Sequence, residues 1–405
     1  MALRAGCGPS LILEPGNVVC HPTAMDDPPR QLFMPGTGQL PPYFAGREDE
    51  QRTLLDCLDV LREGGTVPAD IVLMGPRGNG KTALLRWFDH EIVASRAADA
   101  VSLTPDDITH TDDLSGVLFP SILERIGKTE VKVPQVGSMS VEGGRVGSLT
   151  RRLISRCRRR PRVVLLDEAH NLDLNVGRTL LNVSQRVRAE APFLLILAGT
   201  PNLVDRLGLM GASFWDGSKR LDIGRLDAPA SFDALAKPLV EHGAVVTPGT
   251  LDSVVAESQL YPYFIQVWGD ALWAALRERG TTAVDADIVA VAEPRFQERR
   301  DEYYANRYRE LRREGCLPVA SAVARAFANQ ASTNEDRRTL TDEGLDRAIG
   351  TALPGTDGDA KQAAATRLRE LGYIWQPAGR IDWEPGIPSL MGYVLNPRTV
   401  SRPNT

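Results

Sequence analysis

Residues 75–82 combine glycines with a lysine and a threonine in an order that suits phosphate chemistry. They read Gly-Pro-Arg-Gly-Asn-Gly-Lys-Thr and match GxxxxGK[ST] at every fixed position. Glycines let the backbone curl so that several N–H groups point at one anion, and a helix starting near Gly80 adds its positive dipole end. Lys81 would reach the β and γ phosphates, and Thr82 would offer a hydroxyl to magnesium. The predicted phosphate-binding residues are Gly75, Pro76, Arg77, Gly78, Asn79, Gly80, Lys81 and Thr82.

Two adjacent carboxylates, Asp167 and Glu168, follow the apolar run Val163–Leu166. Four apolar residues suit a strand that is buried on both faces of a parallel sheet. Asp167 at the end of this strand would hold magnesium, and Glu168 would orient and deprotonate an attacking water. The alternative, that the pair caps the next helix, is disfavoured because the loop at 75–82 needs such partners.

A third polar residue, Thr200, ends another apolar run, Phe193–Gly199. Ligands of parallel sheets lie beyond the carboxyl ends of the strands, so Thr200 is placed to touch the γ-phosphate or the water. A threonine before Pro201 is equally suited to cap a helix over 201–208. The two roles are compatible, and the sequence leaves both open.

The elements that must position these residues alternate along the chain. Strands at 71–74, 101–103, 163–167, 193–199 and 220–223 are separated by helical patterns at 47–62, 83–94, 111–126, 148–159 and 172–189. Residues 128–147 read as an inserted hairpin or mobile loop. This alternation predicts an α/β fold with a parallel sheet and helices on both faces.

Strand signals stop after residue 231, and helices are expected at 231–242, 249–257, 262–278 and 286–313. Three shorter helical patterns follow, at 317–329, 340–350 and 360–371, and a hairpin joins 373–376 to 381–384. Three helices followed by a hairpin is the order of a winged helix. The expected divisions are a disordered or loosely attached arm (1–40), a nucleotide-binding domain (41–228), a helical lid (229–285), a connector (286–314), a winged helix (315–397) and a tail (398–405).

The third helix of this winged helix carries Lys361, Arg367 and Arg369, and the hairpin carries Arg380. Such a helix could enter a major groove while the arginine of the wing approaches phosphates. A winged helix can instead serve protein packing or oligomer contact, and this one is not strongly basic. Both alternatives stay open.

Composition bounds the remaining possibilities. The 405 residues carry a net charge of -5, so any nucleic-acid contact must be local. The five cysteines form no C-x-x-C pair, which argues against a disulfide framework or zinc site and fits a cytoplasmic protein. No apolar run approaches the 18 or so residues that span a bilayer, and no membrane association is expected. An arginine-rich run over 151–162 could meet phosphates, but a solvated helix face is favoured.

Together these residues resemble the AAA+ ATPases, in particular the origin-recognition-like branch. Tyr43–Glu48 resembles a box that lies against adenine in relatives, which makes Gly46 and Arg47 candidates for the base pocket. The resemblance gives Thr200 the role of a γ-phosphate sensor. It also places Arg220 where relatives carry an arginine finger for a neighbouring subunit, although an isolated arginine is more often a surface residue.

The stretch Tyr261–Gln266 resembles the start of the lid helix in this branch. Residues 260–272 lack the second sensor arginine of the family, and Pro262 would abut the nucleotide instead. Hydrolysis is therefore expected to be slow or stimulated by a partner. Asp167–His170 also spells the DEAH sequence of a helicase class, but that class needs a second sheet where this chain offers helices.

The sequence thus predicts an AAA+ P-loop ATPase that uses ATP and Mg²⁺ as an ATP-driven switch. Its expected partner is duplex DNA or a DNA-acting protein complex, in replication, transposition or mobile-element defence. Assembly into a homo-oligomer on ATP binding is also expected. The alternative is a signalling or scaffold ATPase whose winged helix is purely structural.

Overall fold

The computed structural model describes residues 29–36, 38–119, 142–211, 217–330, 338–377 and 379–397, without the side chains of 142–145. Its centre is a five-stranded parallel sheet in the order β2-β3-β4-β1-β5. The strands are β1 (Ile71–Met74), β2 (Asp99–Leu103), β3 (Arg162–Leu166), β4 (Phe193–Gly199) and β5 (Lys219–Asp222). The predicted parallel α/β sheet is therefore confirmed.

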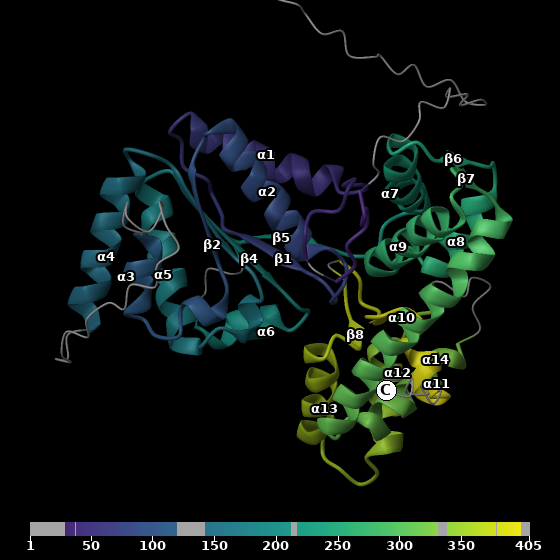
Figure 1. The fold of residues 1–405 in the computed structure, drawn as a ribbon. Coiled ribbons are helices and arrows are strands. Elements are labelled where there is room, and N and C mark those ends of the chain that lie inside the picture. Colours follow the sequence, from purple (N-terminus) through teal and green to yellow (C-terminus); the bar gives the residue numbers. More distant parts are fainter. Residues whose placement is uncertain are drawn as a thin grey trace, which may run out of the picture.

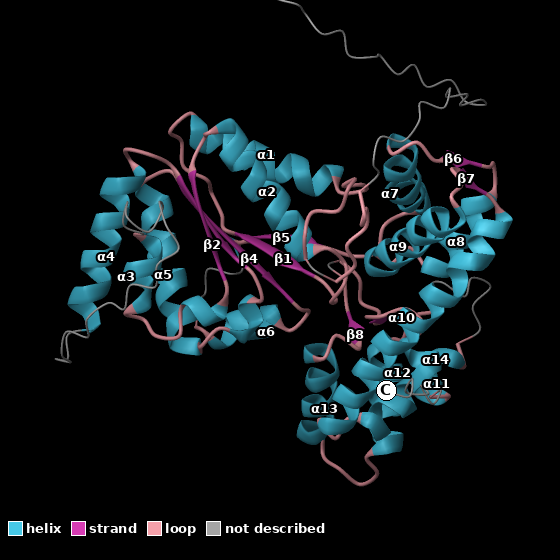
Figure 2. Cartoon of the chain, viewed as in Figure 1, coloured by secondary structure: helices cyan, strands magenta, loops and turns pink. Residues whose placement is uncertain are grey.

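Helices cover both faces of this sheet (Figures 1 and 2). On one face, α1 (Glu48–Arg62) and α2 (Lys81–Ser95) pack on a core that includes Leu194 and Ile196. On the other, α3 (Asp113–Leu118), α4 (Glu142–Cys157), α5 (Leu174–Glu190) and α6 (Leu203–Leu209) pack on a core that includes Leu195 and Leu197. Alternate residues of β4 thus enter opposite cores, as expected for a strand inside two helical layers.

Two of the predicted helices have different bounds. The pattern at 111–126 yields only α3, which ends at Leu118, and residues 120–126 lie outside the described part. Most of the expected insertion at 128–147 also lies outside it, but α4 begins at Glu142 rather than at 148.

The region predicted to be a lid, here called the lid, contains α7 (Ala228–Glu241), α8 (Thr250–Ser258) and α9 (Pro262–Arg279). Contrary to expectation, two short strands accompany these helices: β6 (Val245–Val246) pairs in parallel with β7 (Ala283–Val284). The long helix α10 (Ala286–Arg313) leads away from the lid, and Asp285 caps its first turn. No helix among the described residues is long and apolar enough to cross a membrane.

The last region, here called the C-terminal bundle, contains α11 (Leu317–Ala328), α12 (Asp342–Ala352) and α13 (Gly358–Glu370). An antiparallel pair of two-residue strands, β8 (Ile374–Trp375) and β9 (Glu384–Pro385), follows. A further helix, α14 (Leu390–Leu395), was not expected from the sequence. The order of three helices and a hairpin is observed, while the winged-helix interpretation remains a prediction.

Residues 29–36 and 38–40 differ from the loosely attached arm that the sequence predicts. Phe33 is fully buried against α9, where any side chain at Gly269 would collide with its ring. Trp273 Nε1 donates to the carbonyl of Pro29 over 3.0 Å. This part of the arm joins the hydrophobic core that the lid shares with the C-terminal bundle, because Gly269 leaves space for an aromatic ring.

Candidate nucleotide site

The loop at 75–80 lies between β1 and α2 at the carboxyl end of the sheet. Gly78 and Gly80 have φ of 80° and 93°, a region that favours glycine, and Gly80 is the residue before α2 begins. A Cβ at Gly75 would lie 2.1 Å from the carbonyl oxygen of Ile223, so the neighbouring chain allows no side chain there. The predicted strand, loop and helix are all present, and they direct the first turn of α2 toward the loop.

Lys81 and Thr82 are the first two residues of α2. Lys81 turns toward the loop, and Thr82 turns toward Asp167 at the end of β3. Lys81 Nζ donates to the carbonyls of Gly75 and Pro76 over 2.7 and 2.9 Å. Burial lowers the pKa of Lys81 to about 8, although the nearby carboxylates of Glu168 and Asp167 act in the opposite direction. Among the described residues, the hydrogen bonds of this ammonium group go to backbone oxygens, a position from which it can turn toward a phosphate.

Asp167 and Glu168 directly follow β3, whose neighbours in the sheet are β2 and β4. Thr82 Oγ1 donates to Asp167 Oδ2 over 2.6 Å, which joins the two residues predicted to hold magnesium. Asp167 Oδ1 accepts from the backbone N–H of Glu168 over 2.9 Å. Glu168 has φ of 51°, an unusual conformation for a residue with a side chain, and its side chain is 44% exposed.

His170 connects Glu168 with Thr200. It lies in the short helix η2 (Ala169–Asn171), and its Nε2 is 3.4 Å from Glu168 Oε2. The backbone N–H of Thr200 donates to Nδ1 of His170 over 3.4 Å, and Thr200 Oγ1 donates to Asn202 Oδ1. The sequence indicated only a local polar residue here. The position of His170 two residues after Glu168 was the one sign in the sequence that it belongs to the site. Its other partner, Thr200, is 30 residues away along the chain, so this contact has no local pattern.

The ring of His170 is kept neutral by its surroundings. Burial lowers the pKa of His170 to about 4, and the positive charges of Arg77, Lys81 and Arg206 act in the same direction. A charged imidazolium is thus excluded from the site at neutral pH.

Gly46 and Arg47 tie the loop to the lid. The Arg47 guanidinium is buried and donates to the carbonyls of Asn79, over 3.2 Å, and Gly224. Gly46 lies so close to α7 that a Cβ there would be 2.4 Å from Cβ of Ala230. The sequence placed these two residues in a base pocket, a role that remains a prediction. The structure places the charge of Arg47 on the backbone of the loop.

The lid also contacts the loop directly through Tyr261. Its hydroxyl donates to the carbonyl of Arg77 and lies 3.1 Å from the hydroxyl of Tyr303 in α10. Arg77 itself pairs with Glu310 of α10 at 3.1 Å. Pro262 is the first residue of α9, next to Tyr261. The phosphate-binding loop is therefore attached to both the lid and α10.

Known proteins resemble both the sequence and the fold of this site. Residues 43–196 match the family model described as an AAA ATPase domain. This part of the chain is therefore similar to an AAA ATPase domain. The fold is similar to that of a Walker-type ATPase of Pyrococcus abyssi, at 16% identity and a TM-score of 0.56, covering 87% of this chain and 96% of that one. It is also similar to the ORC2 protein of Aeropyrum pernix in its ADPNP–ADP complexes, at 13% identity and a TM-score of 0.54, covering 88% and 95%. The predicted AAA+ fold is thereby confirmed.

Arg220 lies apart from the other residues that the sequence predicts for the nucleotide site. It is on the edge strand β5, where Nε donates to Asp222 Oδ1 over 2.7 Å. Its terminal nitrogen also donates to the carbonyl of Gln376 in the C-terminal bundle over 3.3 Å. The structure thus brings together 75–82, Asp167, Glu168 and Thr200, whereas Arg220 faces the C-terminal bundle.

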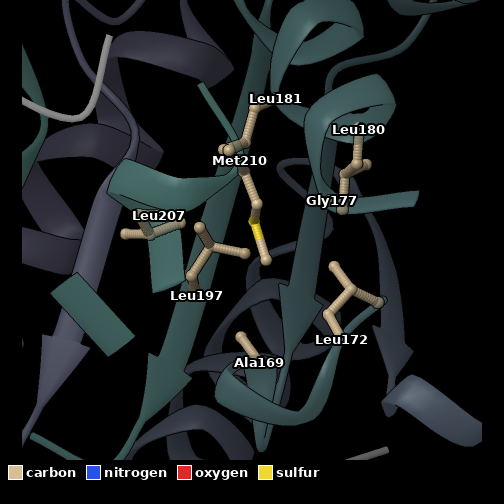
Figure 3. Close-up of a pocket in the computed structure, with 8 residues that line it drawn as sticks. All are labelled: Ala169, Leu172, Gly177, Leu180, Leu181, Leu197, Leu207 and Met210. Carbon is tan, nitrogen blue, oxygen red and sulfur yellow. The ribbon is translucent and has the colours of Figure 1, made fainter. Parts of the chain in front are cut away.

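Two further observations concern the DEAH helicase alternative and a cavity outside the nucleotide site. Among the described residues, the sheets besides the central one are the pairs β6–β7 and β8–β9, so the second sheet of a DEAH helicase is not found there. A small cavity behind η2 is apolar on every side (Figure 3) and suits packing rather than nucleotide binding. Its lining residues are Ala169, Leu172, Gly177, Leu180, Leu181, Leu197, Leu207 and Met210.

Proposed function

We propose that this protein is an ATP-driven switch that binds and hydrolyses ATP with Mg²⁺ and relays the nucleotide state to its C-terminal bundle. The observation that carries the proposal is the double attachment of Arg77. Its carbonyl accepts from Tyr261 of the lid, and its side chain pairs with Glu310 of α10. A loop that rearranges around phosphate must move at least one of these contacts, and α10 leads directly into the C-terminal bundle.

The residues of the loop fit a triphosphate. The buried amide oxygen of Asn79 has no hydrogen-bond partner among the described residues, and the space beside Gly80 is open. Lys81 would exchange the carbonyls of Gly75 and Pro76 for phosphate oxygens. These features support binding of an anion that supplies new partners at the start of α2.

Thr82 and Asp167 would hold Mg²⁺, since hydroxyl and carboxylate oxygens are its preferred ligands. The ion supplies charge neutralisation at the transferred phosphoryl group. Glu168 would orient the attacking water and accept its proton, and its half-exposed carboxylate is accessible for that purpose. Thr200 would offer its hydroxyl to the γ-phosphate.

Several residues would complete the site around the nucleotide. Gly46, Arg47 and Pro262 would lie near the base, and Arg220 would reach the nucleotide of a neighbouring copy in a homo-oligomer. Helix α9 has no arginine in its first turns, which supports hydrolysis that is slow until a partner stimulates it. Arg220 would first have to leave Asp222 and the carbonyl of Gln376.

The expected output is a DNA-associated process, with duplex DNA or a DNA-acting complex as partner. The likeness to the fold of the ORC2 protein and the order of three helices and a hairpin support this proposal. One observation favours the scaffold alternative. Each cation of the predicted DNA-contacting surface has a carboxylate within 3.3 Å; the pairs are Lys361–Asp346, Arg367–Glu314, Arg369–Asp205 and Arg380–Glu384.

The switch can be tested by hydrogen exchange on the full chain with Mg-ATP, with Mg-ADP and without nucleotide. Protection should change in residues 75–82 and also in α9, in α10 and at Gln376. Lys81→Ala should remove all of these changes, which controls for nonspecific nucleotide effects. Changes confined to the loop would contradict the switch while leaving ATP binding intact.

A further inference from the structure

We propose that His170 is a positioning residue that fixes the carboxylate of Glu168 relative to Thr200 through its two ring nitrogens. This inference rests on the proposed ATPase function and adds a residue to it. It starts from the line of contacts from Glu168 through His170 and the backbone of Thr200 to Asn202.

The contacts of His170 require a single tautomer. A backbone N–H only donates, so Nδ1, which faces the N–H of Thr200, must be the unprotonated nitrogen. The proton of the neutral ring is then on Nε2, 3.4 Å from the carboxylate oxygen of Glu168. The ring therefore accepts from one proposed functional residue and donates toward the other.

The surroundings of His170 hold this arrangement in place. The ring is buried, and a Cβ at Gly199 would lie 3.3 Å from Nδ1, so the glycine at the end of β4 lets the ring approach the strand. The charged groups around it are Glu168 in the same segment, Arg77 and Lys81 from the loop and α2, and Arg206 from α6. Burial and, after it, the three cations keep the ring neutral, so the ring carries one proton, on Nε2, which faces Glu168.

Glu168 needs such a support because its own backbone does not fix its side chain. It has a left-handed φ of 51°, and its side chain is 44% exposed. Without the histidine, the carboxylate would be free to turn toward water or toward Lys81. With it, a displacement of Thr200 by the γ-phosphate is transmitted to the group that accepts the proton from water.

The kinetic test compares His170→Leu with His170→Gln. Leucine fills the space without polar atoms, whereas the glutamine amide can accept from Thr200 N–H and donate to Glu168. For His170→Leu, kcat should fall about 10- to 100-fold with little change in the Kd for Mg-ATP. His170→Gln should recover most of the loss. Normal kcat in the leucine variant, or equal losses in two folded variants, would overturn the proposal.

A second measurement does not depend on turnover. Nitrogen-15 NMR of the imidazoles should show His170 with its proton on Nε2 at pH 7 and still neutral at pH 5.5, with its signal assigned by its loss in His170→Gln. A proton on Nδ1, or titration near pH 6.5, would overturn the proposal. Glu168→Gln, measured in parallel, separates the two levels of inference: if it hydrolyses ATP like the wild type, the proposed ATPase mechanism fails, whatever the tautomer of His170.

Discussion

The nucleotide site and the surface of α13 both collect charged side chains, but they hold them by different means. Around the loop, Lys81 donates to backbone carbonyls, and Glu168 is half-exposed next to a neutral histidine. On α13, Lys361, Arg367 and Arg369 each have a carboxylate partner from another element. Carbonyls can be exchanged for a ligand without leaving a charge alone, whereas an ion pair must be broken.

The nucleotide site is therefore ready to bind an anion, whereas the positive charges of α13 are already compensated by carboxylates. Exposed ion pairs contribute only about 0–1 kcal/mol each, so the compensation is easily reversed. Arg369 pairs with Asp205 of α6, and the carbonyl of Gln376 accepts from Arg220. The C-terminal bundle therefore has polar contacts with α6 and β5 that a nucleotide-driven movement could release.

The largest effect is expected at Glu168, whose negative charge should determine the rate of ATP hydrolysis but not the affinity for Mg-ATP. Glu168→Gln should bind Mg-ATP normally and lose about 10²- to 10⁴-fold in kcat, since an amide does not accept the proton of water. Phosphate release and equilibrium nucleotide binding measure the two quantities. Glu190→Gln, at an exposed position of α5, is the matched control and should change neither. If Glu168→Gln hydrolysed ATP at the normal rate, Glu168 would not be the catalytic base.

Lys81→Ala should abolish measurable ATP binding, at a cost of about 2–5 kcal/mol, because a buried cation that meets phosphate is lost. Titration of a fluorescent ATP analogue measures this loss. Lys219→Ala removes an exposed lysine of β5 and should bind as the wild type does. If Lys81→Ala still bound ATP, the loop would not be the nucleotide site.

The neutral state of His170 should make the fold sensitive to acid. Its pKa is lowered to about 4 in the fold and stays near 6.5 in the unfolded chain, so the unfolded state binds the proton first as pH falls. The stability from the neutral ring is complete above pH 6.5 and is lost progressively toward pH 4. Between pH 7 and pH 4.5 the histidine should account for about 2–3 kcal/mol of lost unfolding free energy.

Urea unfolding of wild type and His170→Gln at both pH values measures this share, because other titrating groups are common to the two proteins. The wild type should lose more stability than the variant. An equal loss in both would mean that His170 is solvated and charged at low pH, unlike the environment described above.

The link between Arg77 and Glu310 should contribute about 1 kcal/mol of coupling, since the two side chains are 33% and 18% exposed and only partly desolvated. A double-mutant cycle of Arg77→Ala and Glu310→Ala, read by urea unfolding with and without Mg-ATP, measures it. The coupling should weaken when nucleotide is bound. The exposed pair Arg52–Asp49 is the control and should show no nucleotide dependence. If the coupling energy were the same with and without Mg-ATP, the Arg77–Glu310 contact would not take part in the switch.

The strand, loop and helix around 75–82 could be predicted because the pattern there carries its own strand and helix signals. Asp167, Glu168 and Thr200 follow from the rule that parallel strands end at one edge. The role of Tyr261 escaped prediction because its hydroxyl meets the carbonyl of Arg77, 184 residues away. Residues that contact distant backbone groups leave no local pattern.

The C-terminal bundle was harder to predict for a related reason. Helical periodicity indicated three helices and the cations of α13, but the carboxylates that neutralise them come from α6, α12 and the segment before α11. These ion pairs form only when elements far apart in the sequence pack together, and no short sequence pattern predicts that packing. Helix α14 is only six residues long, too short to show a periodic pattern.

The smallest effect concerns the ion pair between Asp205 and Arg369, and it decides between the two candidate outputs. Asp205→Asn should remove the carboxylate that pairs with Arg369, whose side chain is 20% exposed, and raise duplex DNA affinity at low salt by about 2- to 5-fold, the range of one ion pair near the surface. Asp233→Asn disrupts a pair with Lys237 on α7 and should leave DNA binding unchanged. Fluorescence anisotropy over a series of salt concentrations measures both variants, and the affinity should fall as salt rises. If neither the wild type nor Asp205→Asn bound DNA at low salt, the charges of α13 would serve docking alone, and the scaffold alternative would be the better description of the C-terminal bundle.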